Sequence, residues 1–347
     1  MSSKVAQVSA IDFLPNDTTI HQILILAGNY TEQLNITRQG PVRLIGQTAK
    51  PTDQSRNQVT VYWAAAKGKG SKFSDNAFTS VLTVAPTLNA SLTGASPTGF
   101  DVPPDTPFGN LDFRAYNIDF RNVFAEQAAG PSLTVSISRS NAGFYRCGIY
   151  SYQDTVYIGH LGNTYLYGGE IAGQTDFLYG FGTAWVEKTK LTLRGCKGGV
   201  IAWKGTNTTF ANKYGCYVAR SSIEAANASV AAEYDGHCAL GRPWNELHRS
   251  VYIDSFMDTT VLPRGYIKWR ESNDSTKSNY GNSTFMAEYG SYGPGWNRAA
   301  RGVGNVTIVL DEQTVKPYLN PREVFMTPDG QQPNVEWIDE AFYPYPY

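Results

Sequence analysis

Two aspartates near the middle of the chain, Asp154 and Asp176, stand 22 residues apart within segments of similar sequence. The flanking residues repeat at the same interval, so that Phe144 corresponds to Leu166, and a looser third copy follows at residues 186–191. A period of this length, rich in β-forming residues and glycine, is typical of a solenoid whose successive coils stack on one another. The repeat therefore predicts that the two aspartates occupy equivalent positions on neighbouring coils.

Equivalent positions on neighbouring coils lie at the spacing of adjacent strands, roughly 4.8 Å. Two carboxyl groups held that close cannot both be ionised without cost, so their pKa values are driven apart. One of them then suits the role of an acid, and the other that of a base or a nucleophile. A single aspartate in a coil is more often a turn residue or a surface charge, but the spacing of Asp154 and Asp176 indicates catalytic chemistry.

The composition favours the same solenoid architecture. The chain has 347 residues, of which 41% are hydrophobic, and it contains 33 Gly, 22 Tyr and 16 Phe. Glycine and aromatic residues suit a chain that turns often between short strands. We expect an all-β protein of roughly ten coils, folded as a single domain over residues 1–347. Residues 1–20 are poorly patterned, and we expect the Pro- and Tyr-rich tail at 320–347 to pack outside the coils.

Charge and hydropathy exclude several classes of function. The net charge is −1, so there is no basic field to attract nucleic acid. No apolar run reaches the ~20 residues of a membrane span, and no signal peptide is visible at the start. Nine Asn-X-Ser/Thr sequons nevertheless indicate a glycosylated, secreted protein.

The cysteines do not suggest a metal site. Cys147, Cys196, Cys216 and Cys238 show neither a CxxC motif nor Cys/His ligand spacing. One disulfide bond is compatible with secretion, but the sequence leaves its pairing open. We expect neither a metal ion nor an organic cofactor.

Five segments, taken in order along the chain, resemble the signature blocks of the pectin methylesterases. They are GNYTE at 28–32, YQDT at 152–155, DFLYG at 176–180, LGRPW at 240–244, and the aromatic pair Tyr266 and Trp269. A single block such as QDT is a weak match, whereas the ordered set is specific and spans most of the chain. The Tyr-rich coils and residues 337–339 are more similar to the fungal branch. The resemblance implies a right-handed parallel β-helix with its site in a cleft along the outer face, and we expect 240–244 to open a surface segment.

The resemblance also implies a role for each polar residue in these blocks. Asp176 is expected to attack the methyl-ester carbonyl of a galacturonate unit, with Arg242 keeping it ionised and aimed. Asp154 is expected to start protonated, to donate its proton to the departing methanol, and then to take a proton from water. The side-chain amide of Gln153 is expected to stabilise the oxyanion.

Aromatic residues in the same blocks are expected to bind the substrate. Trp244 and Trp269 would stack against sugar rings, with Tyr152 and Tyr179 as further cleft residues, although either Trp could instead belong to the core. The implied partner is methyl-esterified pectin, bound by a monomer without nucleic acid or membrane.

One position departs from the family pattern. The family carries a second oxyanion glutamine on the preceding coil, and an ungapped count back from Cys147 places Pro131 there. Proline has neither a side-chain donor nor a backbone N–H, and the loss of one oxyanion donor typically costs about 10²–10³ in rate. Either Gln127, Ser132 or Gln174 supplies the missing hydrogen bond, or the protein is a slow or silent pectin-binding relative.

Other classes of enzyme are less well supported. A pectin-acting lyase would need an acidic calcium cluster, and a polygalacturonase a Gly-His-Gly element, whereas here His237 is followed by Cys238. A Ser/His hydrolase is not favoured, because His160 and His248 lie in no nucleophile motif such as GxSxG.

Overall fold

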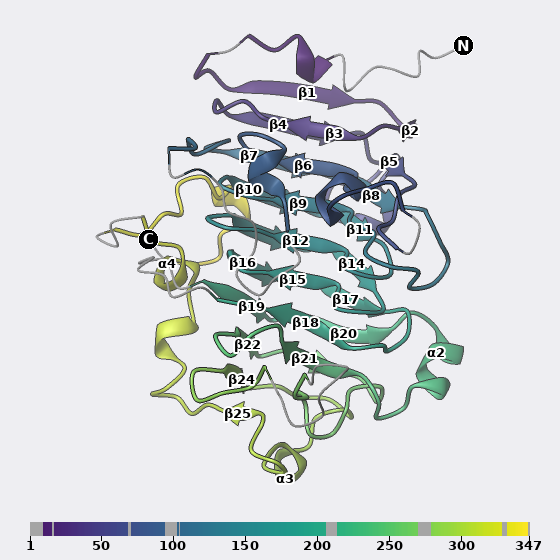
Figure 1. Cartoon of the computed structure of the whole chain (residues 1–347), viewed down its shortest axis with the longest axis vertical. Helices are drawn as coiled ribbons and strands as arrows, with labels where there is room; N and C mark the ends of the chain where they lie inside the picture. The colour runs from purple at the N-terminus through teal and green to yellow at the C-terminus, as the bar shows by residue number, and fades with distance from the viewer. Residues whose placement is uncertain are drawn as a thin grey trace.

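The short β-rich segments of the chain stack coil upon coil in the computed structural model (Figure 1). The structure describes residues 10–15, 17–68, 71–93, 103, 105–205, 214–269, 279–327 and 332–345. Within them the strands form three sheets, in which every paired neighbour is parallel. The prediction of an all-β, right-handed parallel β-helix is confirmed.

Each of the first seven coils contributes one strand to each of three sheets, named A, B and C here, and the later coils add strands to sheets A and B alone. Sheet A consists of β1 (His21–Ile25), β4 (Val42–Gly46), β7 (Phe113–Tyr116), β10 (Asn141–Tyr145), β13 (Asn163–Tyr167), β16 (Thr183–Glu187), β19 (Gly215–Ala219), β22 (Arg249–Ile253), β24 (Phe285–Tyr289) and β25 (Ile308–Val309). Sheet B consists of β2 (Gly28–Thr31), β5 (Val59–Trp63), β8 (Ile118–Asn122), β11 (Gly148–Tyr150), β14 (Glu170–Gly173), β17 (Lys190–Leu193), β20 (Ser222–Ala225) and β23 (Phe256–Met257). Sheet C consists of β3 (Leu34–Ile36), β6 (Leu82–Val84), β9 (Val135–Ile137), β12 (Val156–Ile158), β15 (Leu178–Gly180), β18 (Gly199–Trp203) and β21 (Ala239–Pro243).

Helices are short and lie outside the coils. The α-helices are α2 (Ala228–Glu233), α3 (Arg298–Arg301) and α4 (Pro321–Val324), and the 3₁₀ helices are η1 (Gln54–Arg56), η2 (Asn76–Thr79), η3 (Asn89–Ser91), η4 (Lys316–Tyr318) and η5 (Glu340–Phe342). Across the described ranges, no helix is long and apolar enough to cross a membrane.

Aliphatic side chains fill the inside of the coil as in-register ladders. In sheet C, Leu82 pairs with Val135, Val135 with Val156, and Val156 with Leu178, and all four are buried. Strands whose inward residues stack in this way gain the burial of one apolar side chain for every coil added.

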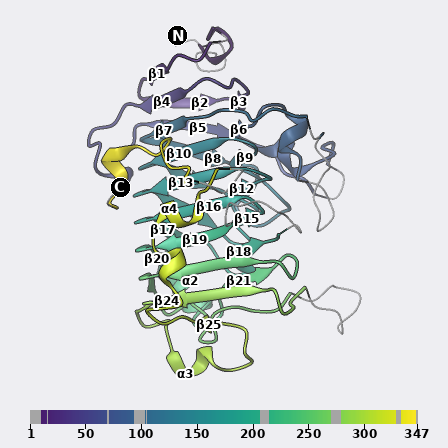
Figure 2. The same cartoon turned by 90° about the vertical axis from the view of Figure 1, so that its left-hand side faces the viewer.

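The C-terminal segment covers the outer side of sheet A, where the yellow trace runs back along the coils (Figure 2). The ring of Phe342 stacks on Tyr145 at a centroid distance of 4.8 Å. Its carbonyl accepts a hydrogen bond of 2.8 Å from the hydroxyl of Tyr165, and Tyr345 packs edge-on against Trp185. The tyrosines and tryptophan on this face are therefore packed against the tail, away from sheet C.

One disulfide bond joins Cys196 to Cys238, which settles the pairing that the sequence left open. Cys147 and Cys216 are buried free thiols. The bond links the corner that precedes β18 to the corner that precedes β21, and both strands belong to sheet C.

The ladder packing predicts where a substitution should destabilise the coil. Replacing Leu191, which is fully buried in β17, by alanine should lower the free energy of unfolding by about 2–5 kcal/mol, because a cavity remains in a stacked core. The neighbouring Lys190→Ala, on the outward side of the same strand, should stay within about 0.5 kcal/mol of wild type. Urea unfolding followed by circular dichroism would compare the two, and equal losses would contradict the ladder description.

Candidate active site

Asp154 and Asp176 lie on adjacent coils, at the corner where the chain passes from sheet B to sheet C. Val156 of β12 pairs with Leu178 of β15, and each aspartate stands two residues before its member of that pair. The N–H of Asp154 donates a hydrogen bond of 3.1 Å to the carbonyl of Thr175. The 22-residue repeat thus brings the two backbones together at the spacing of neighbouring strands.

Both aspartates adopt a left-handed backbone conformation, with φ of 59° at Asp154 and 47° at Asp176. Aspartate tolerates this conformation better than most residues. The same conformation recurs at other corners of the coil, for example at Arg220 and Asp254, so it belongs to the turn of the solenoid. The following coil holds the turn in place, since the N–H of Asp176 donates to the carbonyl of Gly199 at 2.7 Å.

Arg242 and a backbone N–H hold the carboxylate of Asp176. The guanidinium donates from Nε to Oδ1 at 3.0 Å and from Nη2 to Oδ2 at 2.5 Å, while the N–H of Gly199 donates to Oδ1 at 3.1 Å. The Asp176 side chain is only 7% exposed. Charge-assisted hydrogen bonds of this two-pronged kind favour the ionised carboxylate and fix its direction.

The corner before β18 needs glycine to approach the carboxylate so closely. Gly198 has φ of +115°, and a Cβ at this position would lie 2.9 Å from Oδ1 of Asp176 and 3.0 Å from Nη2 of Arg242. The disulfide bond starts two residues earlier, at Cys196, and ends at Cys238 just before β21. It therefore joins the corners that lead into β18 and β21, the strands whose Gly199 and Arg242 donate hydrogen bonds to Asp176.

Asp154 has different surroundings from its neighbour. Burial raises the pKa of its carboxyl group well above the usual value, and the negative charge of Asp176 raises it further, while Arg242 acts in the opposite direction. Arg242 therefore acts on both carboxyl groups, through hydrogen bonds on Asp176 and through its charge on Asp154. The pair therefore combines an ionised, directed Asp176 with an Asp154 that retains its proton at higher pH than an ordinary aspartate.

A row of aromatic rings lies beside the two carboxyl groups, on the outer face of sheet C. Tyr157, Tyr179, Ala202 and Arg242 follow one another in register across β12, β15, β18 and β21. The Tyr157 and Tyr179 rings are 4.9 Å apart, and Tyr179 is 5.7 Å from Trp244. Tyr179 is only 3% exposed, so it packs under the neighbouring rings of the row and presents little surface of its own.

The two tryptophans keep part of their surface free. Trp244 and Trp269 are partly buried against the aromatic row, and the guanidinium carbon of Arg242 lies 3.8 Å from the centre of the Trp269 ring. Tyr152 is half-buried, with the guanidinium of Arg194 over its ring at 4.8 Å. The structure therefore gathers most of the sequence-predicted residues around one corner, with Tyr152 turned toward Arg194.

The hydrogen bonds of the corner agree with the ungapped count that places Pro131 opposite Gln153. The N–H of Asp154 donates to the carbonyl of Thr175, which pairs with Gln153, and one coil earlier the N–H of Ser132 donates to the carbonyl of Gln153 at 3.0 Å. Ser132 therefore corresponds to Asp154, and Pro131 to Gln153. The offset becomes 21 residues only in the strand that follows, where Val135 pairs with Val156.

The donors considered as substitutes differ in their described contacts. The Ser132 hydroxyl lies 2.8 Å from that of Ser151 and donates to the carbonyl of Gln153 at 3.3 Å. The Gln174 side chain is buried, and its oxygen accepts from the N–H of Ala128 at 2.9 Å. Gln127 is exposed. The Ser132 hydroxyl is thus engaged, and a second donor from Gln127 or from the Gln174 amide nitrogen stays a prediction.

Sequence reasoning missed two contributors to the site. The repeat could have found Gly199, which stands one coil after Asp176. Nothing in the sequence around Lys204 signals that this residue is buried, but it lies fully buried against Trp244.

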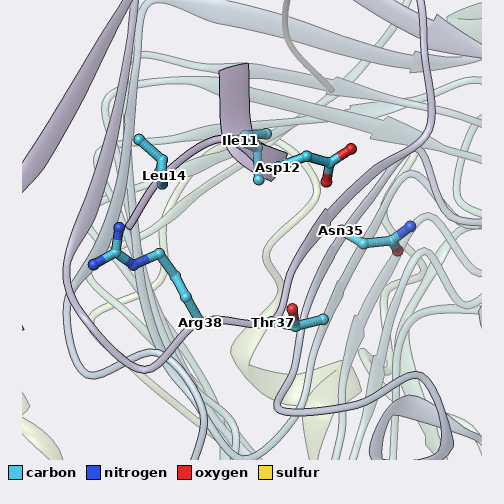
Figure 3. A pocket seen from close by; sticks show the side chains of 6 residues that line it. All are labelled: Ile11, Asp12, Leu14, Asn35, Thr37 and Arg38. Carbon is cyan, nitrogen blue, oxygen red and sulfur yellow. The ribbon is translucent and has the colours of Figure 1, made fainter. Parts of the chain in front are cut away.

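Two cavities of similar volume lie elsewhere among the described residues, and neither is lined by either aspartate. One of about 360 Å³ lies at the N-terminal end of the coil, lined by residues from 11 to 38 (Figure 3). Another of about 350 Å³ is lined by residues that include Phe73, Phe124 and Ala129. The described residues contain no cluster of three or more His, Cys, Asp or Glu side chains arranged to hold a metal ion.

Relatives of known family match the chain in sequence. The family model described as pectinesterase matches residues 107–320. The chain is 31% identical over 208 residues to putative pectinesterase 11 of Arabidopsis thaliana, covering 59% of this chain and 53% of that protein. It is 26% identical over 307 residues to probable pectinesterase A of Aspergillus niger, covering 88% of this chain and 80% of that protein. The match thus spans about half the length of the Arabidopsis relative.

Solved structures share the fold. The pectin methylesterase from carrot superposes with a TM-score of 0.73 at 20% identity, covering 98% of this chain and 92% of that chain. Deglycosylated pectin methylesterase from Aspergillus niger gives a TM-score of 0.70 at 22% identity, covering 96% and 92%. Since the family model covers more than half of its length, the chain belongs to the pectinesterase family, which consists of carboxylic ester hydrolases.

Proposed function

We propose that this protein is an active pectin methylesterase, which hydrolyses methyl esters of galacturonate units in pectin to pectate and methanol. The observation that carries the proposal is the unequal pair of carboxyl groups. Asp176 is held by Arg242 and by the N–H of Gly199, while burial and the Asp176 charge raise the pKa of Asp154. An ester hydrolysis through a covalent intermediate needs one group of each kind.

In the first step, a carboxylate oxygen of Asp176 attacks the ester carbonyl carbon. The carbonyl oxygen becomes an oxyanion, which the side-chain amide of Gln153 stabilises. The bond to the methoxy oxygen then breaks, and Asp154 donates its proton to that oxygen, so that methanol leaves. The products of this step are an anhydride between Asp176 and the galacturonate, and an ionised Asp154.

In the second step, the ionised Asp154 takes a proton from a water molecule, whose oxygen attacks the galacturonate carbonyl of the anhydride. Collapse of this intermediate releases the galacturonate carboxylic acid and restores the Asp176 carboxylate. Asp154 regains its proton in the same step, so the sum is one ester and one water converted to one acid and one methanol.

The aromatic row supports a sugar polymer as the substrate. Trp244 and Trp269 are only partly buried at this corner, and flat apolar rings suit pyranose sugars. A pectin methylesterase of the same fold, with a TM-score of 0.70 at 23% identity, has been solved in complex with a hexasaccharide. These features favour methyl-esterified homogalacturonan as the partner.

Several features favour an extracellular, glycosylated protein. The Cys196–Cys238 disulfide suits an oxidising compartment. Six sequon asparagines are exposed in the described part of the chain, namely Asn29, Asn35, Asn89, Asn227, Asn282 and Asn305. Asn16, Asn207 and Asn273 lie outside the described residues. A monomeric state remains our expectation.

A binding protein without turnover is the second candidate, and Pro131 is the observation that favours it. Proline has no side-chain donor, and the hydroxyl of the next residue, Ser132, bonds to Ser151 and to the backbone of Gln153. The oxyanion would then depend on Gln153 without a second side-chain amide opposite it. Such a loss typically lowers the rate by about 10²–10³. Methanol release separates a slow enzyme from a pure binding protein.

The purified protein should release methanol from methylated pectin without added metal, and Asp176→Ala should reduce the rate by at least about 10³-fold, because the nucleophile is lost. A matched control is Asp254→Ala, since Asp254 also has a left-handed backbone, with φ of 46°, at the corner after β22. This control should keep the wild-type rate. If the wild-type protein binds methylated pectin but releases no methanol, the enzyme assignment is wrong and the binding assignment stands.

The raised pKa of Asp154 should also be visible in stability. The unfolded carboxyl titrates near 3.8, so above that pH the unfolded chain has released a proton that the folded chain still retains. The contribution of Asp154 to stability therefore falls as the pH rises through its folded pKa. Asp154→Asn removes this cost and should raise the thermal midpoint at pH 7 above that of the wild type, with a smaller difference at pH 3.5.

Asp176→Asn is the matched control for this measurement. It removes the charge paired with Arg242, so it should lower the thermal midpoint at pH 7. Differential scanning calorimetry at both pH values measures all three proteins. A lower midpoint for Asp154→Asn than for wild type at pH 7 would contradict the assigned state of Asp154.

A further inference from the structure

A buried lysine lies directly against the tryptophan of the aromatic row. Lys204 follows β18, and its N–H donates to the carbonyl of Gly180 at 2.9 Å, while the N–H of Trp244 donates to the carbonyl of Trp203 at 2.9 Å. These hydrogen bonds set Lys204 between Phe181 on one coil and Trp244 on the next. Lys204 is fully buried, so it cannot itself contact a polymer in the cleft.

The ammonium group makes close contacts with both rings. Its nitrogen lies 3.8 Å from the centre of the Trp244 ring and 4.7 Å from that of Phe181. A cation over the face of a tryptophan is attracted by the ring quadrupole, most strongly when the cation is shielded from water. Two residues before Trp244, the Arg242 guanidinium both holds Asp176 and covers the Trp269 ring. Each tryptophan at the site is therefore in contact with a cation.

Two titratable groups lie near Lys204 in the described part of the chain. The charge of Asp75, which caps η2, acts favourably on the ammonium and offsets part of the cost of burial. His160 stacks on Phe181 at 5.4 Å, but burial and the charge of Arg139 lower its pKa to about 4, so it is neutral at pH 7. The ammonium is therefore stabilised by Asp75 as well as by the two rings.

We propose that Lys204 is a positioning residue, whose ammonium fixes the indole of Trp244 beside the nucleophile as the surface on which a uronate ring of the substrate rests. The inference rests on the proposed function and deepens it. Lys204 acts through Trp244 and takes no part in proton transfer, so its removal should weaken substrate binding and leave the chemical step intact.

The same arrangement makes substrate binding sensitive to pH. Burial lowers the pKa of Lys204 to about 7, so the ammonium loses its proton as the pH rises through neutrality. Its attraction for the Trp244 ring is then lost, and KM should rise over this range. This change is distinct from the dependence of kcat on Asp154.

The test compares Lys204→Met, which keeps the length of the side chain and removes its charge, with Lys204→Arg, which restores a cation. For methyl-ester hydrolysis at pH 6, Lys204→Met should raise KM by about threefold to thirtyfold and leave kcat within about twofold, while Lys204→Arg should recover most of the loss. The rise of KM between pH 6 and pH 8 should be absent in Lys204→Met. Lys188→Met is a matched control, because Lys188 lies 5.5 Å over the Tyr167 ring on sheet A, and it should leave KM unchanged.

A double-mutant cycle shows whether Lys204 acts through Trp244. In a Trp244→Ala background, Lys204→Met should have no further effect on KM. An unchanged KM in Lys204→Met, or an equal effect with and without Trp244, would overturn the proposal.

The dissociation constant of a partly methylated galacturonate hexasaccharide, measured by calorimetry, repeats the cycle without turnover. If the wild type releases no methanol, the proposed enzymatic function fails, while this binding cycle still supports or overturns the role of Lys204.

Discussion

The parallel register of sheet C is the constraint on which the site depends. A side chain in one coil has no choice of neighbour, because the backbone hydrogen bonds fix the residue that lies beside it at roughly 4.8 Å. Asp154 and Asp176 are adjacent for this reason alone. The coil thereby forces together two like charges that a more adaptable surface would separate.

The two carboxyl groups avoid this repulsion because their surroundings differ. Arg242 and the N–H of Gly199 reach Asp176 from the next two coils, and the Cys196–Cys238 bond joins the corners from which they come. The charge of Arg242 lowers the pKa of Asp154 only in part, and burial keeps that pKa above its usual value. The asymmetry thus runs along the coil axis, with positive charge on the C-terminal side of the pair.

The repeat allowed the fold and the adjacency of the aspartates to be predicted from sequence, because both follow from period and residue type. The count also gave the residue opposite Gln153, Pro131, but it could not show that the offset falls to 21 residues in the strand that follows. The segment at 240–244 was expected to open a surface segment, but most of it forms β21, with Leu240 fully buried. Lys204 was missed because lysine is rarely buried, and the carboxylate whose charge favours its ammonium, Asp75, stands more than a hundred residues earlier.

The regular coil also explains how several destabilising groups can be tolerated at one corner. Two left-handed aspartates, a carboxyl group with a raised pKa and a buried ammonium each destabilise the folded state. Each is nevertheless flanked by strands whose inward residues are fully packed, such as Val156 and Leu178. Each coil is stabilised mainly by its immediate neighbours. The destabilising groups at this corner therefore lower the stability of only the few coils that contain them. Substitutions that relax the corner should therefore stabilise those coils and at the same time remove the groups that the chemistry needs.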